Sequence, residues 1–356
     1  MKHLLSYIKL RGFRFAFNLF YYHFFWCDRQ PLMTKLIYWL RPYPPYIEIE
    51  VTTRCNMKCV MCEHTYWNEP EKDMSFEEFK YILDQFPRLH WIGLTGIGES
   101  FLNKDFLKML SFAKSKSFIV EIYDNFSLID KDTASELIRL KIDTVYASID
   151  AATKETYEKI RPGGNFERVI NNVRYFMEAK RIKGAPLTAF NFHYIISKYN
   201  IHELLAYLEL VHSLAQGLNP IVQFTRLLHS YKEINDLFVE VPQDLILKAE
   251  DKARELGITL SWNANTKGVK PLPTKCIEWT MPFIFVTGDV IPCCAGNEAN
   301  RRDFQKAYSL GNIFKTRFKD IWRGNKYKQL IDSLCRGRFP PPCSDCCLYR
   351  EDNKCS

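Results

Sequence analysis

Three cysteines lie within eight residues in the segment RCNMKCVMC (54–62), and they are the first candidates for chemistry in this chain. Three residues separate Cys55 from Cys59, and two separate Cys59 from Cys62. Thiolates bind zinc and iron–sulfur clusters, and both kinds of centre ordinarily take four ligands. Three thiolates are therefore an incomplete set, and the chemistry depends on what fills the fourth position.

The other cysteines gather at the opposite end of the chain. The sequence has 12 cysteines, none of them between residues 63 and 275, and all but Cys27 of the remainder lie beyond 275. A disulfide scaffold is usually small and rich in cysteine throughout. Two cysteine clusters that flank a cysteine-free body indicate two metal sites in a reducing, cytoplasmic environment.

Charge is concentrated at the N-terminus. The 356 residues carry a formal net charge of +8, and residues 1–41 hold seven basic residues against one acidic residue, which accounts for +6 of it. The rest of the chain is nearly balanced, so the composition argues against a nucleic-acid partner.

The same segment is strongly aromatic. The run FRFAFNLFYYHFFWC (13–27) follows basic residues but lacks a small-residue cleavage site, and it is shorter than the roughly 20 residues needed to span a bilayer. Two interpretations stay open. The run is either a helix that covers one side of the body, or a basic amphipathic helix that gives residues 1–41 a peripheral contact with the inner face of a membrane.

The middle of the chain alternates between strand and helix patterns. Ser75 with Glu78 forms a predicted capping box, and Asp130 is a predicted helix cap. Repeated βα units predict a parallel sheet with the active site at the carboxyl ends of the strands. The six predicted strands are 46–53, 91–96, 119–125, 144–150, 187–197 and 220–228, and the helices between and after them are 75–86, 105–116, 131–140, 153–159 with 166–182, 202–214 and 243–256.

Six units are too few for the usual eight-stranded barrel, so we predict an α/β fold: a partial (β/α)6 TIM-like barrel. It has an N-terminal helical segment and a small cysteine-rich C-terminal domain. The predicted boundaries are 1–45, 46–262 and 263–356.

Polar motifs follow the first four predicted strands: the three cysteines, GIGES (96–100), DN (124–125) and SID (148–150). With these motifs in place, the Cys-x3-Cys-x2-Cys spacing after the first strand resembles the signature of radical S-adenosylmethionine (SAM) enzymes. The resemblance covers about residues 46–230. It implies that the three thiolates hold a 4Fe-4S cluster whose fourth iron is left for the amino and carboxylate groups of SAM.

The resemblance also implies SAM-binding residues, and the chain departs from the family at two places. Met61 stands where an aromatic residue is usual before the third cysteine, and Phe126 replaces the glycine of a third-strand turn. We expected Gly96 and Gly98 to let the backbone approach the methionine end of SAM. The implied cofactor-binding residues are Met61, Gly96, Gly98, Glu99, Asn125, Ser148, Asp150, Arg161 and Ile195.

The C-terminal segment, about residues 274–350, resembles the SPASM/Twitch extension of some radical SAM enzymes. It contains Cys276, a predicted hairpin in which four residues separate Gly288 from Cys293, a GNI segment and a final Cys-x2-Cys. The resemblance implies one auxiliary 4Fe-4S cluster on Cys276, Cys293, Cys343 and Cys346. Alternatives left open are a second cluster using Cys335, Cys347 or Cys355, and zinc in the same tetrathiolate. Cys27 and Cys294 are expected to be packing thiols.

As a function, the resemblance implies reductive cleavage of SAM to a 5′-deoxyadenosyl radical that takes hydrogen from a substrate C–H bond. A one-electron donor such as flavodoxin or ferredoxin would supply the cluster, and a net oxidation would pass an electron to the auxiliary cluster. Polar residues expected to face the barrel are Glu48, Glu50, Tyr123, Asn191, His193 and Arg226, with Glu50 and His193 as catalytic candidates.

Three hypotheses were compared: an oxidoreductase acting on a small biosynthetic metabolite, a maturase of a peptide or protein, and a non-enzymatic iron–sulfur electron carrier. No separate peptide-docking domain is evident, which favours the small molecule.

Overall fold

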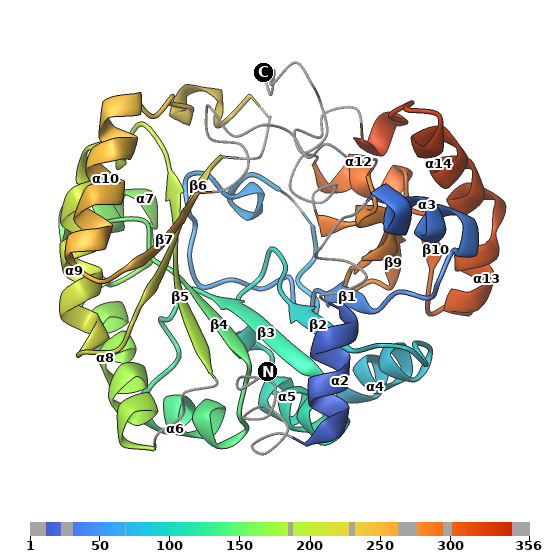
Figure 1. The fold of residues 1–356 in the computed structure, drawn as a ribbon, viewed down its shortest axis with the longest axis horizontal. Helices are drawn as coiled ribbons and strands as arrows, with labels where there is room; N and C mark the ends of the chain where they lie inside the picture. The colour runs from blue at the N-terminus through green and yellow to red at the C-terminus, as the bar shows by residue number, and fades with distance from the viewer. Residues whose placement is uncertain are drawn as a thin grey trace.

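The computed structural model describes residues 12–22, 31–67, 69–183, 188–227, 232–262, 276–294 and 301–343. Within these ranges the strands form one ten-stranded sheet in the order β10-β9-β8-β1-β2-β3-β4-β5-β6-β7. The sheet curves, and the helices of the βα units cover its outer side (Figure 1).

Seven parallel strands form the main body of the sheet. They are β1 (Tyr46–Ile49), β2 (Trp91–Leu94), β3 (Ile119–Asp124), β4 (Thr144–Ser148), β5 (Ala189–Ile196), β6 (Ile221–Arg226) and β7 (Thr259–Trp262). All six predicted strands are confirmed. The sequence analysis missed β7, which pairs with β6 in parallel. Its short TLSW pattern alternates exposed and half-buried positions, so it lacked the continuous apolar run that marked the other strands.

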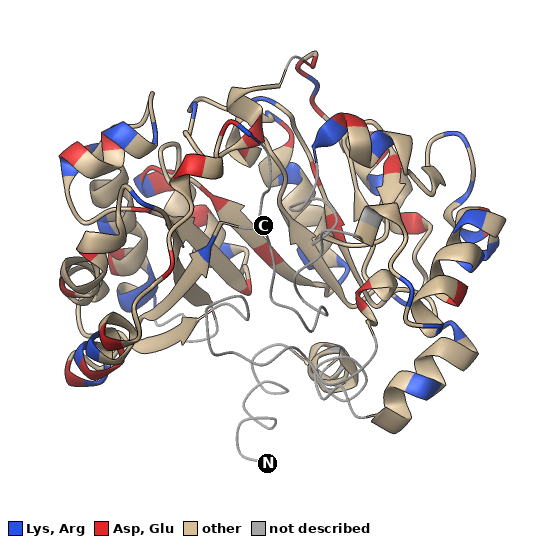
Figure 2. Ribbon diagram, turned by 90° about the horizontal axis from the view of Figure 1, so that it is seen from above, with Lys and Arg blue, Asp and Glu red and all other residues tan. Residues whose placement is uncertain are grey.

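Helices connect these strands as expected. They are α4 (Phe76–Asp84), α5 (Phe106–Ser115), α6 (Lys131–Arg139), α7 (Lys154–Ile160), α8 (Phe166–Ile182), α9 (Leu204–Ala215) and α10 (Gln243–Glu255). Ser75 and Glu78 form the predicted capping box of α4, and Asp130 caps α6 by accepting from the backbone N–H of Thr133. Along the outer helices, Lys and Arg alternate with Asp and Glu (Figure 2).

The C-terminal segment continues the barrel sheet. β8 (Phe283–Ile284) pairs in parallel with β1, and it forms an antiparallel hairpin with β9 (Asp289–Ile291) around Gly288, whose φ is 85°. β10 (Gly311–Asn312) adds to β9, and α12 (Arg302–Ala307), α13 (Phe318–Arg323) and α14 (Asn325–Cys335) complete this part. The boundary predicted at residues 262 and 263 falls beside residues outside the described ranges and stays a prediction.

Two N-terminal helices pack on different parts of the body. α2 (Phe13–Tyr22) buries Phe15 and Ala16 and sets the ring of Tyr22 at 4.8 Å from that of Trp91, at the start of β2. α3 (Pro31–Leu40) packs on the C-terminal part, where the Tyr38 hydroxyl donates to the Cys276 carbonyl oxygen at 2.6 Å. The inner faces of both helices therefore cover the body, as the first interpretation of this segment expected.

No helix in the described ranges combines the length and the apolar character needed to cross a bilayer.

Candidate active site

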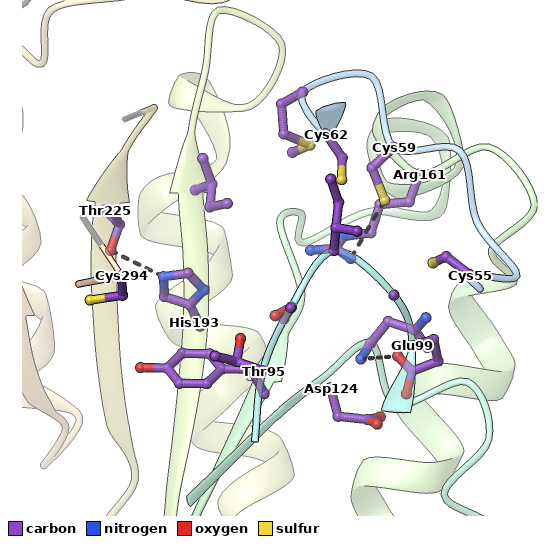
Figure 3. Close-up of a pocket in the computed structure, with 18 of the residues that line it drawn as sticks. Cys55, Cys59, Cys62, Thr95, Glu99, Asp124, Arg161, His193, Thr225 and Cys294 are labelled. Carbon is purple, nitrogen blue, oxygen red and sulfur yellow. Dashed lines mark hydrogen bonds between the residues drawn. The ribbon is translucent and has the colours of Figure 1, made fainter. Parts of the chain in front are cut away.

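A cavity of about 340 Å³ lies at the carboxyl ends of the parallel strands, the edge at which the sequence analysis placed the active site. The loops after β1, β2, β3 and β4 supply one side of it, and β5 and β6 supply the other. In Figure 3 the three cysteines and Arg161 lie on one side of the cavity, with His193, Thr225 and Cys294 across from them. Its volume falls in the range of small-molecule pockets, roughly 300 to 1,000 Å³.

The loop after β1 brings Cys55, Cys59 and Cys62 to the cavity wall. Backbone bonds fix this loop, since Lys58 N–H donates to the Pro162 carbonyl oxygen at 2.8 Å and Cys62 N–H donates to that of Cys59 at 3.0 Å. Burial raises the pKa of Cys55 to about 11 and that of Cys62 to about 12. Without metal these thiols are therefore protonated at neutral pH, and metal binding has to release their protons.

The glycines after β2 make room for neighbouring protein atoms. A Cβ on Gly98 would lie 2.3 Å from the Thr52 carbonyl oxygen, and one on Gly96 would lie 2.6 Å from Cγ of Glu50. Both glycines line the cavity, but their close contacts are with the cysteine loop and with Glu50 rather than with an open ligand space. The expected approach of their backbone to SAM stays a prediction, and the structure adds a second reason for glycine here. They allow the second-strand loop to dock on the cysteine loop.

Glu99 lies on the cavity wall and is almost fully buried. Its carboxylate accepts from the backbone N–H groups of Asn125 at 3.0 Å and Phe101 at 3.3 Å. A carboxylate has about four acceptor sites, so capacity is left for a ligand amino group. Burial, followed by the charge of Glu99, raises the pKa of the neighbouring Asp124, so the pair holds a proton.

The turn after β3 keeps its shape without a glycine. Phe126 adopts a φ of 60°, and its ring is fully buried at 5.4 Å from the ring of Phe190. Its N–H donates to Asp124 Oδ1 at 2.6 Å, and Asn125 lines the cavity. A left-handed conformation is costly for a residue with a Cβ. The buried aromatic contacts with Phe176 and Phe190 offset that cost.

Two residues near β4 have different roles. Ser148 lines the cavity as predicted, but Asp150 does not. Asp150 is fully buried and accepts from Arg161 Nε at 2.7 Å and from Ile195 N–H at 2.7 Å. Its carboxylate is committed to protein donors, which argues against the predicted contact with ribose hydroxyls. The structure makes Asp150 a positioning residue for Arg161.

Arg161 faces the cysteines. One guanidinium nitrogen lies 3.7 Å from Cys59 Sγ, and the residue lines the cavity. Burial by itself would lower the pKa of Arg161, but the charge of Asp150 raises it above its usual value. A permanent positive charge beside a thiol favours the thiolate that binds metal.

Met61 and Ile195, both predicted to contact SAM, line the cavity and belong to one apolar cluster around Ile160 and Leu227. His193 also lines the cavity, and its Nε2 lies 3.2 Å from Thr225 Oγ1. Burial lowers the pKa of His193 to about 4, so the imidazole is neutral at pH 7.

Glu50, the other catalytic candidate, does not line the cavity. Its carboxylate forms an ion pair with Arg302 at 2.5 Å, and the exposed fractions of the two side chains are 1% and 3%. It also accepts from Ile97 N–H at 3.2 Å. A buried carboxylate committed to a guanidinium cannot act as a base toward the cavity, so the structure argues against the predicted catalytic role.

The C-terminal cysteines are described in part. Cys276, Cys293 and Cys343 lie within the described ranges, whereas Cys346, Cys347 and Cys355 lie outside them, as does Cys27. Burial, and after it the proximity of Cys276, Cys335 and Cys343, raises the pKa of Tyr38, so these three thiols gather near one side chain. The four-cysteine set stays a prediction.

Three residues that line the cavity were not predicted from the sequence to be part of the site. Cys294, expected to be a packing thiol, lines the cavity, and so do Gln223 and Thr225 of β6. Alternation along β6 pairs Gln223 with Thr225 on one face, a signal that the sequence offered but that we did not use.

The donor set fits an iron–sulfur cluster better than a single ion. Within the described ranges, no three His, Cys, Asp or Glu side chains converge closely enough to hold one metal ion. A zinc ion needs its thiolates about 2.3 Å from one point, whereas a cubane distributes them over separate irons. Thiols spread around one cavity wall, with Arg161 and a glycine loop beside them, suit the larger group.

The fold and the site thus define an enzyme that binds an iron–sulfur cluster inside a partial βα barrel, and comparison with known proteins gives its family. Residues 49–211 match the Radical SAM superfamily, and residues 276–347 match the iron-sulfur cluster-binding domain called SPASM. The chain therefore contains a radical SAM domain and, after it, a SPASM domain. These domains imply SAM and a 4Fe-4S cluster in the first and auxiliary iron–sulfur ligation in the second.

Relatives match along most of the chain. The tungsten-containing aldehyde ferredoxin oxidoreductase cofactor-modifying protein of Pyrococcus furiosus is 26% identical over 85% of this chain and 87% of its own length. The Fe-coproporphyrin III synthase of Methanosarcina barkeri is 27% identical over 87% of this chain and 80% of its own. The structure of Streptococcus suis SuiB bound to precursor peptide SuiA has a TM-score of 0.62 at 16% identity and covers 83% of this chain and 69% of SuiB, a likeness in fold alone.

Proposed function

We propose that this protein is a radical SAM enzyme that removes hydrogen from a C–H bond of a small biosynthetic metabolite, in a net oxidation. The observation that supports this most is the single cavity that three thiols, the glycine loop with Glu99, and His193 all line. When bound, the cluster and SAM together supply a 5′-deoxyadenosyl radical on delivery of one electron from a donor such as flavodoxin or ferredoxin.

The chain's own residues would bind and orient. Cys55, Cys59 and Cys62 hold the cluster, and Glu99 accepts hydrogen bonds from the SAM amino group. Met61, Ser148, Asn125 and Ile195 would contact the rest of the cofactor. Arg161 stays fixed by Asp150 and holds positive charge at the thiolates.

His193 would act at the substrate side as a neutral group. Its hydrogen bond with Thr225 orients the ring, and its lowered pKa leaves one ring nitrogen free of a proton at pH 7. That nitrogen can accept a proton from a substrate group placed next to it. We therefore propose that His193 accepts the proton that the substrate loses on oxidation.

We keep the assignment of one auxiliary cluster to Cys276, Cys293, Cys343 and Cys346. Held there, it would supply an electron acceptor for a net oxidation. Cys294 packs against Phe283, Phe285 and Ile291 of the β8–β9 hairpin and also lines the cavity, which supports proximity between this domain and the cavity. We also propose the three-part division predicted from the sequence, with the N-terminal segment at 1–45, the barrel at 46–262 and the C-terminal domain at 263–356.

Support for a small molecule over a peptide comes from the relatives. Three relatives match along at least 80% of both chains, and their names refer to modifying a cofactor, to making Fe-coproporphyrin III and to AdoMet-dependent heme synthesis. The alternatives are a peptide maturase and a non-enzymatic electron carrier, and the assays described next distinguish them from the proposed function.

The deciding experiment is anaerobic reconstitution followed by iron analysis and a SAM-cleavage assay. One SAM-binding and one auxiliary cluster give about eight irons per chain. The Cys62→Ala variant should lose about four irons and all formation of 5′-deoxyadenosine, while Cys335→Ala keeps both. Turnover is then compared between small polyols and a ribosomal precursor peptide. Wild-type protein that holds its clusters but leaves SAM intact under strong reduction would point to the electron carrier.

A contact of residues 1–41 with an anionic membrane surface is a second proposal. The observation in its favour is that α2 and α3 expose large apolar side chains although their inner faces are packed. Trp39 is 79% exposed, and Lys35 beside it on α3 is exposed as well. The exposed apolar residues are Phe13, Phe17, Phe20, Leu32, Trp39 and Leu40. Aromatic side chains near basic ones suit the interface of an anionic bilayer.

Vesicle flotation tests this contact. Full-length protein should float with phosphatidylglycerol vesicles and less with phosphatidylcholine vesicles. The variant Phe17→Ser/Trp39→Ser should stay in the lower fraction, while Tyr175→Ser, at an exposed aromatic of α8, should behave as wild type. Equal flotation of all three proteins would overturn the proposal.

A further inference from the structure

The cavity has a second end, where most of the lining residues are not among the proposed SAM contacts. It is formed by His193 of β5, by Gln223, Thr225 and Arg226 of β6, and by Cys294 after the β8–β9 hairpin. His193, Thr225 and Cys294 lie together on this side in Figure 3. Parallel pairing of β5 with β6 sets His193 beside Gln223 and Ile195 beside Thr225, so the polar groups of the two strands come to one wall.

Arg226 is half-buried, and it differs in its partners from the two buried arginines of this region. Arg161 is paired with Asp150, and Arg302 is paired with Glu50. For Arg226, no carboxylate in the described ranges lies within ion-pair distance, and its Nε donates to no described acceptor. The nearest counter-charge felt by the guanidinium is that of Glu240, which is itself exposed.

The position of Arg226 favours a ligand for this charge. Burial lowers the pKa of Arg226, which means that its surroundings disfavour the charged form. A guanidinium held in a cavity wall without a neutralising carboxylate is stabilised when an anion binds to it, and Nε with one terminal nitrogen is an edge that binds oxyanions through two parallel bonds.

Other residues that line the cavity could bind a polar group and a planar group of a ligand. Gln223 and Thr225 line the same cavity as Arg226 and add an amide and a hydroxyl to it. Tyr123, which also lines the cavity, stacks on Tyr146 with the ring centroids 4.1 Å apart and the planes within 1°. The acidic Glu48 of β1 lines the same cavity, and its carboxylate accepts from the Tyr46 hydroxyl at 2.8 Å.

We propose that Arg226 binds an oxyanion of the substrate, a carboxylate or a phosphate, and so orients the substrate across the cavity from the cysteines. This inference rests on the proposed function, because it takes the cavity to be the substrate site. It restricts the substrate class to acidic small molecules.

The test measures binding to cluster-loaded protein in the presence of SAM, by anaerobic titration calorimetry. Three probes share one ring and differ in charge: phenylacetate, phenyl phosphate and the neutral phenylacetamide. Wild type should bind at least one of the anions about 10-fold or more tightly than the amide, since hydrogen bonds to charged groups have about this effect. The tighter of the two anions identifies the source as carboxylate or phosphate.

Variants then assign the preference to one side chain. Arg226→Met should bring the three dissociation constants within about twofold of each other, and Arg226→Lys should keep part of the preference because it keeps the charge. The control Arg254→Met, at a 76% exposed arginine of α10, should match wild type. Cluster absorbance and melting temperature show that each variant is folded.

Two results would overturn the proposal: wild type without preference for either anion, or Arg226→Met with the preference intact. The release of 5′-deoxyadenosine is measured on the same preparations. Loss of that release in wild type, with anion preference retained, counts against the proposed function and not against the anion site.

Discussion

Replacing Glu50 by Gln should clearly lower the stability of this protein and should have little effect on the rate of SAM cleavage. The Glu50–Arg302 pair joins the barrel to the C-terminal domain, and both side chains are at most 3% exposed. Removing one partner of a buried pair costs about 3–5 kcal/mol because the other charge stays buried. Arg302 keeps a partial substitute, since its guanidinium lies 3.8 Å from the centroid of Phe285, which lowers the expected cost to about 2–4 kcal/mol.

The assay is thermal unfolding of cluster-loaded protein at one scan rate, because a chain with bound clusters does not unfold in two states. At about 2–4 °C per kcal/mol, Glu50→Gln should lower the apparent melting temperature by about 5–15 °C. The matched control is Glu136→Gln, which breaks the surface pair with Arg139, whose side chain is 65% exposed. That change should move the midpoint by no more than about 3 °C.

A double-mutant cycle completes the test. Glu50→Gln combined with Arg302→Met removes both charges, so the double variant should lose less stability than the sum of the single variants. Additive losses, or a Glu50→Gln midpoint equal to that of the surface control, would refute the reasoning. A 100-fold loss of SAM cleavage at an unchanged melting temperature would restore the catalytic assignment that the geometry argues against.

Three further predictions follow from other positions. Phe126→Gly and Phe126→Ala should both lose about 3–5 kcal/mol of aromatic burial, but only glycine relieves about 1–2 kcal/mol of strain at the positive φ of this residue. Melting temperatures should therefore fall in the order wild type, Phe126→Gly, Phe126→Ala. A Phe126→Ala variant that melts above Phe126→Gly would contradict the strain. Burial raises the pKa of Glu121 to about 7, so the folded chain holds a proton that the unfolded chain releases. Relative to Glu121→Gln, wild type should therefore be stabilised below about pH 5 and lose that advantage as pH rises through 7; a pH-independent difference between the two midpoints would count against it. Asp150→Asn should lower the iron bound after reconstitution, since Arg161 loses the anchor that holds its charge beside Cys59; an iron content equal to that of wild type would indicate a different role.

Much of the fold could be predicted from local sequence patterns. Ser75 with Glu78 and Asp130 cap helices through residues three positions away, so their contacts could be predicted from sequence spacing alone. The six predicted strands follow from apolar runs of the right length. β7 was missed because its four residues are half-exposed and its only strand partner is β6.

The sequence by itself determined the cluster motif, the order of βα units and the edge of the sheet where polar residues meet, because each depends on spacing within a few residues of one strand. Only the tertiary structure decided how buried charges are used. Alternation puts Glu48 and Glu50 on one face of the chain, but it cannot say that Glu50 meets an arginine 252 residues later while Glu48 lines the cavity. Asp150 and Arg226 show the same limit, because whether a buried charge is paired depends on side chains brought together by folding and not on its neighbours in sequence.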